Sequence, residues 1–331
     1  MKNSLKHFLL LSLLVLLTVF RLSAQDKFKM TVAQDGSGDF TTIQAAIESC
    51  KSYPDARITI FAKNGIYHEK VKVPSCNTFL SIIGENVDKT IISFGDFFSQ
   101  INKGRNSTFY TSTMLVLADD FIAENLTIEN TAGPVGQAVA LDVESDRCVF
   151  RNCRILGNTD TLYTAGQYSR QYFTDCYIEG TTDFIFGDAT VLFEGCTVCN
   201  KSNSYATAAS TTKGKQFGYV FLKCKMIAKE GVNHAFLGRP WRDYAKVVYL
   251  NCEIGAHIAP EGWANWDKTS TRDKTAYYAE FGNTGPGANT DKRIAWSHQL
   301  TTNEAEKYTA ANILAPYFPA APSVASWTTG K

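Results

Sequence analysis

Two short strings, each containing an aspartate, recur in the middle of the sequence. Thr159-Asp160-Thr161-Leu162-Tyr163 and Thr182-Asp183-Phe184-Ile185-Phe186 share Thr-Asp, an aliphatic residue at the fourth place and an aromatic residue at the fifth. The aspartates are 23 residues apart, and Gln137 lies another 23 residues before Asp160. If 23 residues make one turn of a β-structure whose strands pair about 4.8 Å apart, these three polar side chains lie side by side.

Two carboxyl groups on neighbouring turns favour acid–base and nucleophilic chemistry. Like charges at that distance do not both ionise readily, so the pKa of one group rises and that group can act as an acid. Arg239 lies 56 residues after Asp183, the length of two turns of 28, and can hold that aspartate ionised. Gln137 offers an amide N–H to a developing oxyanion. Aromatic side chains, which often bind sugar rings, are expected to line the same groove: Tyr163, Phe186 and Trp241.

A simpler interpretation is that both aspartates only stabilise turns, where aspartate is common. The occurrence of a glutamine, two aspartates and an arginine in one register argues against it.

A repeated string indicates the elements that must position these side chains. Each copy has two apolar residues, two further residues, a cysteine, one more residue, and then an aliphatic residue or methionine. An earlier copy has Leu126 in place of the cysteine, and the steps between copies are 27, 23, 20, 28 and 28 residues. The cysteines of the other copies are Cys153, Cys176, Cys196, Cys224 and Cys252.

Self-similarity at this period, with apolar alternation inside each unit, predicts a β-solenoid. The leucine-and-asparagine consensus of leucine-rich repeats is missing, as is the 3.6-residue periodicity of helical repeats. A position that accepts leucine or cysteine indicates an internal apolar ladder. We therefore expect buried thiols, although one or two disulfides stay open because neighbouring turns bring sulfurs close together.

The predicted fold is all-β, a right-handed parallel β-helix in one domain. Its strands begin at 30–33, continue at 57–62 and 80–83, and form regular turns over 114–254. A short helix over 43–47, capped by Thr41 or Thr42, is expected to cover the open apolar end. Residues 95–113 are expected to form a loop that leaves the solenoid, and residues 302–327 a helix and an ordered tail.

Composition and the amino terminus restrict the class of protein further. The chain has 331 residues and a formal net charge of +1, which gives no indication of nucleic-acid binding. Residues 1–24 have a basic start, an apolar run over 8–20 and a small residue at Ala24, as in a signal peptide. A retained membrane anchor is the alternative. We expect an exported protein, periplasmic or secreted, whose mature chain of residues 25–331 has no membrane span and is monomeric.

Taken together, the motifs resemble those of the pectinesterase family, the pectin methylesterases. The resemblance covers nearly all of the chain after residue 24. It includes Asp35-Gly36-Ser37-Gly38, Thr42-Ile43-Gln44-Ala45-Ala46, Gly65-Ile66-Tyr67-His68-Glu69, Ala132-Gly133-Pro134, Gln137-Ala138-Val139-Ala140-Leu141, Asp160-Thr161-Leu162-Tyr163, Asp183-Phe184-Ile185-Phe186-Gly187, Leu237-Gly238-Arg239-Pro240-Trp241 and Pro260-Glu261-Gly262-Trp263.

The resemblance implies a role for each residue of the site. Asp183 is expected to be the nucleophile that attacks the methyl-ester carbonyl of a galacturonate unit. Asp160 is expected to protonate the departing methanol and then to act as base for the hydrolytic water. Gln137 would stabilise the oxyanion and Arg239 would orient the nucleophile.

The same resemblance implies a substrate and a groove that binds it. The substrate is pectin, methyl-esterified homogalacturonan. The residues expected to contact it are Tyr163, Phe186, Trp241, Trp263 and Thr159. No cofactor and no metal are expected, and the histidines show no metal-ligand spacing.

Thr159 departs from the family pattern, which has a glutamine immediately before the acid–base aspartate. That glutamine supplies a second oxyanion donor, and loss of one such donor commonly costs about 10²–10³ in rate. A threonine hydroxyl is too short to occupy the same place. Three outcomes fit: a slower esterase with Gln137 as the sole side-chain donor, a site that uses ordered water, or a changed ester specificity.

Other functions fit the same scaffold. A pectate lyase would need a calcium-binding acidic cluster and a basic proton abstractor, and a polygalacturonase several carboxylates around a glycosidic bond. An esterase or thioesterase of altered specificity is another possibility. A non-catalytic solenoid would bind pectin but release no methanol.

Overall fold

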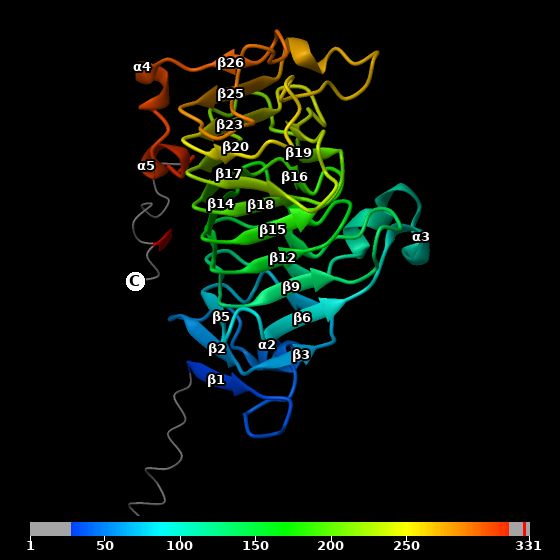
Figure 1. Ribbon diagram of the computed structural model, residues 1–331. Helices are drawn as coiled ribbons and strands as arrows, with labels where there is room; N and C mark the ends of the chain where they lie inside the picture. Colours follow the sequence, from blue (N-terminus) through cyan, green and yellow to red (C-terminus); the bar gives the residue numbers. More distant parts are fainter. Residues whose placement is uncertain (1–27, 318–326, 329–331) are drawn as a thin grey trace, which may run out of the picture.

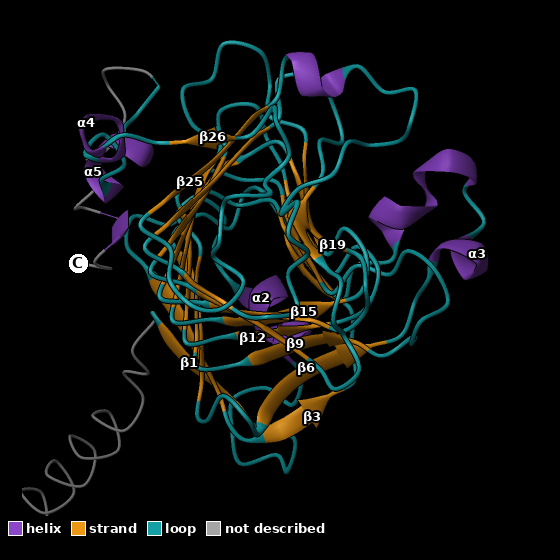
Figure 2. Ribbon diagram, turned by 45° about the horizontal axis from the view of Figure 1, so that its top comes forward, coloured by secondary structure: helices purple, strands orange, loops and turns teal. Residues whose placement is uncertain are grey.

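The computed structural model describes residues 28–317, 327 and 328, and three long parallel sheets wind around one apolar interior (Figures 1 and 2). The predicted signal peptide, residues 1–24, lies outside the described residues. Most turns of the chain contribute one strand to each sheet, and strands of successive turns pair in parallel. This arrangement confirms the predicted all-β parallel β-helix.

The 11-stranded sheet runs the length of the molecule. Its strands, in spatial order, are β1 (Lys29–Val32), β2 (Ile58–Ala62), β5 (Leu80–Gly84), β8 (Ile122–Glu124), β11 (Cys148–Arg151), β14 (Arg170–Thr174), β17 (Thr190–Glu194), β20 (Tyr219–Leu222), β23 (Lys246–Leu250), β25 (Tyr277–Phe281) and β26 (His298–Gln299).

The seven-stranded and eight-stranded sheets complete the turns. The seven-stranded sheet contains β4 (Val71–Val73), β7 (Met114–Val116), β10 (Leu141–Val143), β13 (Leu162–Thr164), β16 (Ile185–Gly187), β19 (Tyr205–Ala209) and β22 (Phe236–Gly238). The eight-stranded sheet contains β3 (Gly65–Tyr67), β6 (Thr90–Phe94), β9 (Thr127–Asn130), β12 (Arg154–Leu156), β15 (Tyr177–Gly180), β18 (Thr197–Asn200), β21 (Lys225–Ala228) and β24 (Glu253–Ile254).

The repeated string encodes the corner between the 11-stranded and eight-stranded sheets. In each copy the residue before the ladder position has a left-handed backbone, with φ between 46° and 64°. Asparagine, aspartate or glycine, which tolerate this conformation best, fills the position in every copy except that of Lys223. The ladder residues themselves, the five cysteines and Leu126, are buried in the core. All nine cysteines are free, so no disulfide forms.

A helix closes the first end of the solenoid. Helix α2 (Ile43–Ser49) begins after Thr42, whose hydroxyl accepts a hydrogen bond from the Ala45 amide at 3.2 Å. Its buried residues Ile43, Ala46 and Ile47 belong to the main core, which confirms the predicted capping helix.

Over residues 302–317 the carboxyl-terminal segment differs from the predicted single helix, and most of the predicted tail, residues 318–326, lies outside the described residues. Two short helices, α4 (Thr302–Ala305) and α5 (Ala310–Ile313), replace that helix because Thr301 and Thr309 each cap a separate start. Ile313 and Leu314 pack against apolar residues on the outer face of the 11-stranded sheet. Within residues 28–317, 327 and 328, no helix has the length and apolar character of a membrane span.

The segment 95–113 leaves the solenoid, as predicted, but it is not irregular. It forms helix α3 (Phe98–Ile101) and the 3₁₀ helix η1 (Gly104–Tyr110), which project to one side (Figures 1 and 2). Several hydrogen bonds attach it to the turn that carries Gln137. The Phe98 amide donates to the Gln137 carbonyl at 2.9 Å, and the Val139 amide donates to the Thr111 hydroxyl at 2.9 Å. A second 3₁₀ helix, η2 (Arg272–Lys274), lies near the other end.

Candidate active site

The two aspartates stand on neighbouring strands in the register predicted from their spacing. Strand β13 pairs with β16 so that Leu162 lies opposite Ile185 and Tyr163 opposite Phe186, an offset of 23 residues. Asp160 and Asp183 each lie two residues before these strands, in left-handed conformations with φ of 63° and 52°. Aspartate tolerates this conformation better than most residues. The carboxyl groups therefore project from equivalent corners of adjacent turns.

Arg239 holds Asp183 with two hydrogen bonds. Its Nε donates to Oδ1 at 3.0 Å and its Nη2 to Oδ2 at 2.7 Å. The guanidinium lies between the rings of Tyr205 and Trp266, 4.0 and 4.1 Å from their centroids, and also donates to the Trp266 carbonyl at 3.3 Å. A cation fixed on both faces and along its edge is well suited to hold a carboxylate in one orientation.

The two carboxyl groups differ in their electrostatic surroundings. Burial raises the pKa of Asp183, and the hydrogen bonds and charge of Arg239 act against that rise. Burial raises the pKa of Asp160 well above its ordinary value, the negative charge of Asp183 adds to the rise, and Arg239 opposes it only through space. The geometry therefore favours an ionised Asp183 beside a protonated Asp160.

Gln137 does not share the register of Asp160, which corrects the prediction from spacing. It forms a bridge with Thr159 instead. Leu141 is four positions after Gln137, whereas Leu162, which is opposite Leu141, is only three positions after Thr159. The extra residue is a β-bulge, and the amides of Ala140 and Leu141 both donate to the Thr161 carbonyl. Gln137 and Thr159 consequently lie side by side next to the aspartates.

These side chains line one cavity of about 350 Å³. Its wall comes from the seven-stranded sheet, from η1 and from the segment after β24. The lining residues are Arg105, Thr108, Phe109, Gln137, Thr159, Asp160, Thr182, Asp183, Phe186, Ala208, Arg239, Trp241 and Trp266. Tyr163 supports the wall, since its ring packs against Phe109 and Phe186 with centroids 5.0 and 4.7 Å away.

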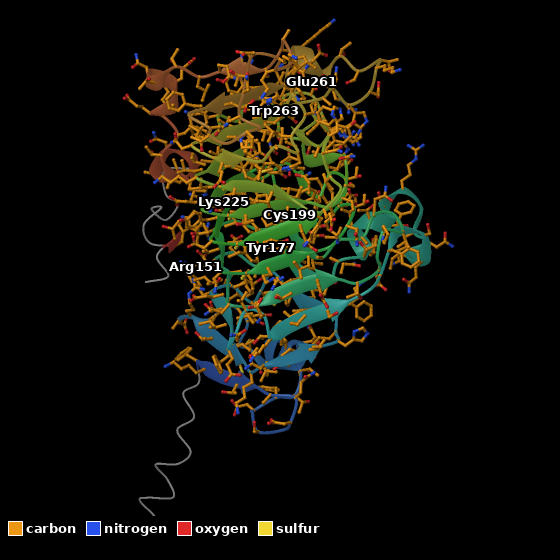
Figure 3. The ribbon with its side chains drawn as sticks, viewed as in Figure 1. Arg151, Tyr177, Cys199, Lys225, Glu261 and Trp263 are labelled. Atoms are coloured by element: carbon orange, nitrogen blue, oxygen red, sulfur yellow. The ribbon has the colours of Figure 1, made fainter. Side chains whose placement is uncertain are left out.

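Trp263 is a correction to the predicted groove. It lies among the last turns of the solenoid (Figure 3). Its side chain is fully buried in the main core, with its ring 4.8 Å from Tyr278, and its Nε1 donates to Glu280 at 3.2 Å. A tryptophan with no exposed surface cannot contact a polysaccharide. Trp266, three residues later, reaches the cavity in its place.

Several cavity residues were not predicted from the sequence. Arg105, Thr108 and Phe109 lie in a segment outside the repeat, so no periodicity indicated which of its side chains face the site. Trp266 had a usable signal, because it is a second large aromatic residue only three positions after Trp263, where a sugar-binding ring was expected.

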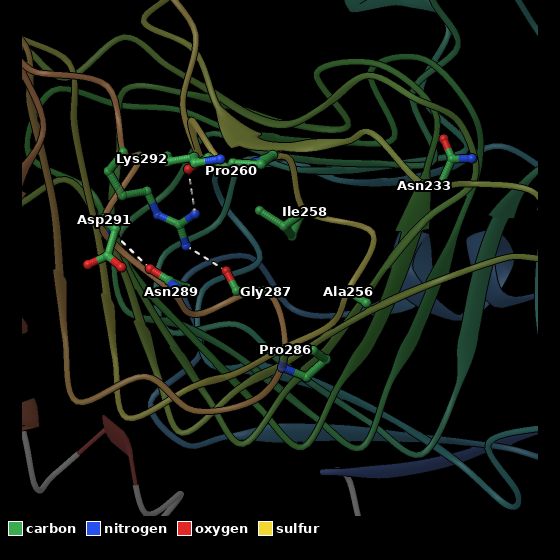
Figure 4. Close-up of a pocket in the computed structure, with 10 residues that line it drawn as sticks. Asn233, Ala256, Ile258, Pro260, Pro286, Gly287, Asn289, Asp291 and Lys292 are labelled. Atoms are coloured by element: carbon green, nitrogen blue, oxygen red, sulfur yellow. Dashed lines mark hydrogen bonds between the residues drawn. The ribbon is translucent and has the colours of Figure 1, made fainter.

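A second cavity of similar volume lies near the carboxyl-terminal end of the solenoid (Figure 4). Its wall includes Ile258, Pro260, Pro286 and Lys292. Arg293 also borders it, but its guanidinium is engaged with Glu280 at 2.8 Å and with the Gly287 carbonyl at 2.7 Å. Among the described residues, no group of three or more histidine, cysteine, aspartate or glutamate side chains is arranged to hold a metal ion.

Comparisons with known proteins agree with this geometry. A family model described as Pectinesterase matches residues 29–316. Pectinesterase 31 of Arabidopsis thaliana is 38% identical over 293 residues, which cover 86% of this chain and 92% of that protein. The structure of pectin methylesterase from carrot superposes with a TM-score of 0.80 at 32% identity, covering 89% of this chain and 97% of that one. A pectin methylesterase in complex with a hexasaccharide gives a TM-score of 0.76 at 28% identity, covering 88% and 98%.

Proposed function

Because the chain belongs to the pectinesterase family, we propose that it removes methyl esters from pectin through an acyl-enzyme formed on Asp183, releasing methanol and pectate. It is a carboxylic ester hydrolase. The observation that carries the proposed mechanism is a pair of adjacent carboxyl groups of which one is held by two hydrogen bonds from Arg239 and the other is favoured in its protonated form.

In the first half-reaction, a carboxylate oxygen of Asp183 attacks the carbonyl carbon of the ester. The tetrahedral intermediate collapses with cleavage of the bond to the methoxy oxygen, and that oxygen takes the proton of Asp160 and departs as methanol. The products are an anhydride between the galacturonate carboxyl and Asp183, and an ionised Asp160. Strands about 4.8 Å apart place the two carboxyl groups close enough for these roles.

In the second half-reaction, Asp160 is the base. It takes a proton from water as the water oxygen attacks the galacturonyl carbon of the anhydride. The bond to the Asp183 oxygen then breaks, and the product leaves as a galacturonic acid, whose carboxyl group loses its remaining water proton to the solvent. This step restores a protonated Asp160 and an ionised Asp183, so the cycle closes with one water consumed and one methanol formed.

The oxyanion that develops in both steps would be stabilised from the side of Gln137. Its amide lines the cavity next to Asp160 and can donate to the oxyanion. Thr159 lies beside it, but its hydroxyl already shares a hydrogen bond of 3.1 Å with the hydroxyl of Thr181. We therefore propose that Gln137 is the main side-chain donor to the oxyanion. A site with one amide donor is expected to react more slowly than a site with two.

The polysaccharide would lie over the aromatic wall. Phe186 and Trp241 pack edge to face with centroids 5.8 Å apart, and Phe109 and Trp266 complete the apolar surface. Apolar faces of sugar rings pack on such surfaces while polar groups at the centre fix the reacting unit. Trp266 takes the role in substrate binding that was predicted for Trp263.

The basic, apolar and small-residue pattern of residues 1–24 supports export to the periplasm or the outside of the cell. On this proposal residues 25–331 form a single catalytic domain that acts as a monomer on an extracellular polymer.

Methanol release from highly methylated pectin tests the function directly. We expect methanol from the wild-type chain, none from Asp183→Asn, and up to about 10²-fold more from Thr159→Gln, which restores a second amide donor. Wild-type activity with no response to Asp183→Asn would contradict the assigned nucleophile. If only Thr159→Gln released methanol, the wild-type site would act on another ester or only bind pectin.

A further inference from the structure

A second guanidinium group contacts the tryptophan that stacks on Arg239. Arg272, in η2, has its guanidinium carbon 5.0 Å from the centroid of the Trp266 ring, and its Nη1 donates to the Pro240 carbonyl at 3.3 Å. We propose that Arg272 is a positioning residue, which holds Trp266 against Arg239 and so keeps the Asp183 carboxylate oriented for attack. The inference rests on the proposed function. Arg272 itself does not line the cavity, so it acts on the reaction through its neighbours.

The two rings that enclose Arg239 differ in how they are held. Tyr205 lies in β19, which pairs with β22, and its ring stacks on that of Phe236 with centroids 5.4 Å apart. Trp266 lies outside the helices and strands. Its amide donates to the Asn265 side chain at 2.9 Å, a bond that fixes the backbone but not the ring. The orientation of the Trp266 ring therefore depends on side-chain contacts, among them the two guanidinium groups.

The turn that carries Arg272 is closed by hydrogen bonds. The Asn265 Nδ2 donates to the Ser270 carbonyl at 2.8 Å and to the Asp273 Oδ1 at 2.9 Å. The Arg272 amide donates to the Ser270 hydroxyl at 3.3 Å. Arg272 is therefore presented from an anchored turn, and its bond to the Pro240 carbonyl joins that turn to the segment between β22 and β23.

The contacts form a continuous path from Arg272 to the nucleophile. Arg272 lies over the Trp266 ring, whose centroid is 4.1 Å from the Arg239 guanidinium. Arg239 in turn donates two hydrogen bonds to Asp183. A guanidinium group is attracted to the face of an indole and stacks on it, so Arg272 favours one orientation of the ring. Without Arg272 the ring can turn away from Arg239, whose own orientation is then less restricted. Misplacement of a reacting group by about 1 Å can cost about 10²-fold in rate, so this freedom is measurable.

The test is a double-mutant cycle on methanol release from highly methylated pectin. We expect Arg272→Gln to lower kcat about three- to tenfold in the wild-type background. In a Trp266→Leu background the same change should lower kcat by less than about twofold, because the ring through which Arg272 acts is gone. The acid limb of the kcat/KM profile should move to higher pH, since a less ordered Arg239 holds Asp183 ionised less well. Arg272→Lys keeps a cation near the ring and should recover part of kcat.

Lys274→Gln is the matched control, because it removes one positive charge from the same 3₁₀ helix at an exposed position. Among the described residues, only Arg239 and Arg272 place a cation over the Trp266 ring. Lys274→Gln should therefore keep the wild-type kcat and acid limb.

Thermal melts separate positioning from stability, since a merely structural role for Arg272 would lower Tm and leave the acid limb in place. The inference is overturned if Arg272→Gln keeps the wild-type kcat and acid limb, if it raises KM alone, or if its loss of kcat is equal in both backgrounds. An equal loss in Lys274→Gln would also overturn it. Absence of methanol from wild type would instead contradict the proposed function, on which this inference rests.

Discussion

A carboxylate that must stay ionised in a partly buried cavity needs a cation that cannot swing away. Asp183 is 8% exposed, and its partner Arg239 is fixed between two aromatic rings. The stacking matters because a free arginine loses conformational entropy whenever it pairs, whereas Arg239 is already ordered. On the proposed mechanism, Tyr205 and Trp266 are therefore positioning residues for the nucleophile Asp183.

Arg239→Gln tests this electrostatic arrangement through pH dependence. On the proposed mechanism, activity needs an ionised Asp183, present above its pKa, and a protonated Asp160, present below its pKa. Arg239 lowers both pKa values, so its removal raises both. We expect the acid limb of the kcat/KM profile to move to higher pH, with a loss of at least about tenfold at the wild-type optimum.

Arg239→Lys keeps the charge but not the two parallel hydrogen bonds, and its acid limb should move less than that of Arg239→Gln. Initial rates of methanol release across the pH range measure both variants. An acid limb that stays at the wild-type position in Arg239→Gln would contradict the assigned role.

At the scale of the element, strand β10 carries an unusual residue. Asp142 lies between Leu115 and Tyr163 on neighbouring strands and is fully buried. Neither of its carboxylate oxygens has a hydrogen-bond partner among the described residues. Burial raises its pKa well above the ordinary value, and the charge of Glu144 adds to the rise. The strand therefore contains a buried carboxyl group whose neutral form is favoured and which has no hydrogen-bond partner among the described side chains and backbone.

Asp142→Leu should stabilise the fold by roughly 1–3 kcal/mol, the cost of an unsatisfied buried polar group. The gain should depend on pH. A raised pKa means that wild-type stability is fully present below the pKa of the unfolded chain and declines as pH rises toward the folded value. The difference in the free energy of unfolding between Asp142→Leu and wild type should therefore increase as pH rises through that interval.

Denaturant unfolding at several pH values measures this difference. The expectation fails if Asp142→Leu is no more stable than wild type at any pH, or if the difference in their free energies of unfolding decreases as pH rises.

At the scale of the whole molecule, stability comes from stacking and not from covalent links. Parallel pairing continues over three sheets, and stacked aromatic rings run through the core. The ring pairs Phe150–Phe173, Phe193–Phe221 and Phe221–Tyr249 have centroids 4.6, 4.5 and 4.3 Å apart. The cysteine ladder is part of this apolar filling, and burial raises the pKa of a further core thiol, Cys148, to about 12. The Cys148 thiol is consequently a poor nucleophile.

We therefore expect nine titratable thiols per chain after denaturation without reductant, and no change in Tm when a reductant is added to the folded protein. Thiol counting in denaturant and a pair of thermal melts check this. Seven or fewer thiols, with a Tm lowered by reductant, would show that a disulfide contributes to the fold.

The sequence by itself determined the features that repeat. Three features are local properties of the sequence: the period of 20–28 residues, the inward ladder and the alternation within each strand. When similar units stack on one another, these features produce a solenoid without further information. The same logic placed Asp160 beside Asp183, because both occupy the same place in consecutive units. Helix α2 followed from its capping threonine and apolar spacing.

Only the tertiary structure revealed the positions of residues that lie where the repeat is interrupted. One extra residue before β10 moved Gln137 into register with Thr159, a shift that spacing counts cannot reveal. Trp263 turned inward because the last turns need a large side chain to close the core, which left Trp266 to face the cavity. Arg105 joined the site because its segment is attached to the adjacent turn by non-local hydrogen bonds, and such contacts have no signature in the local sequence.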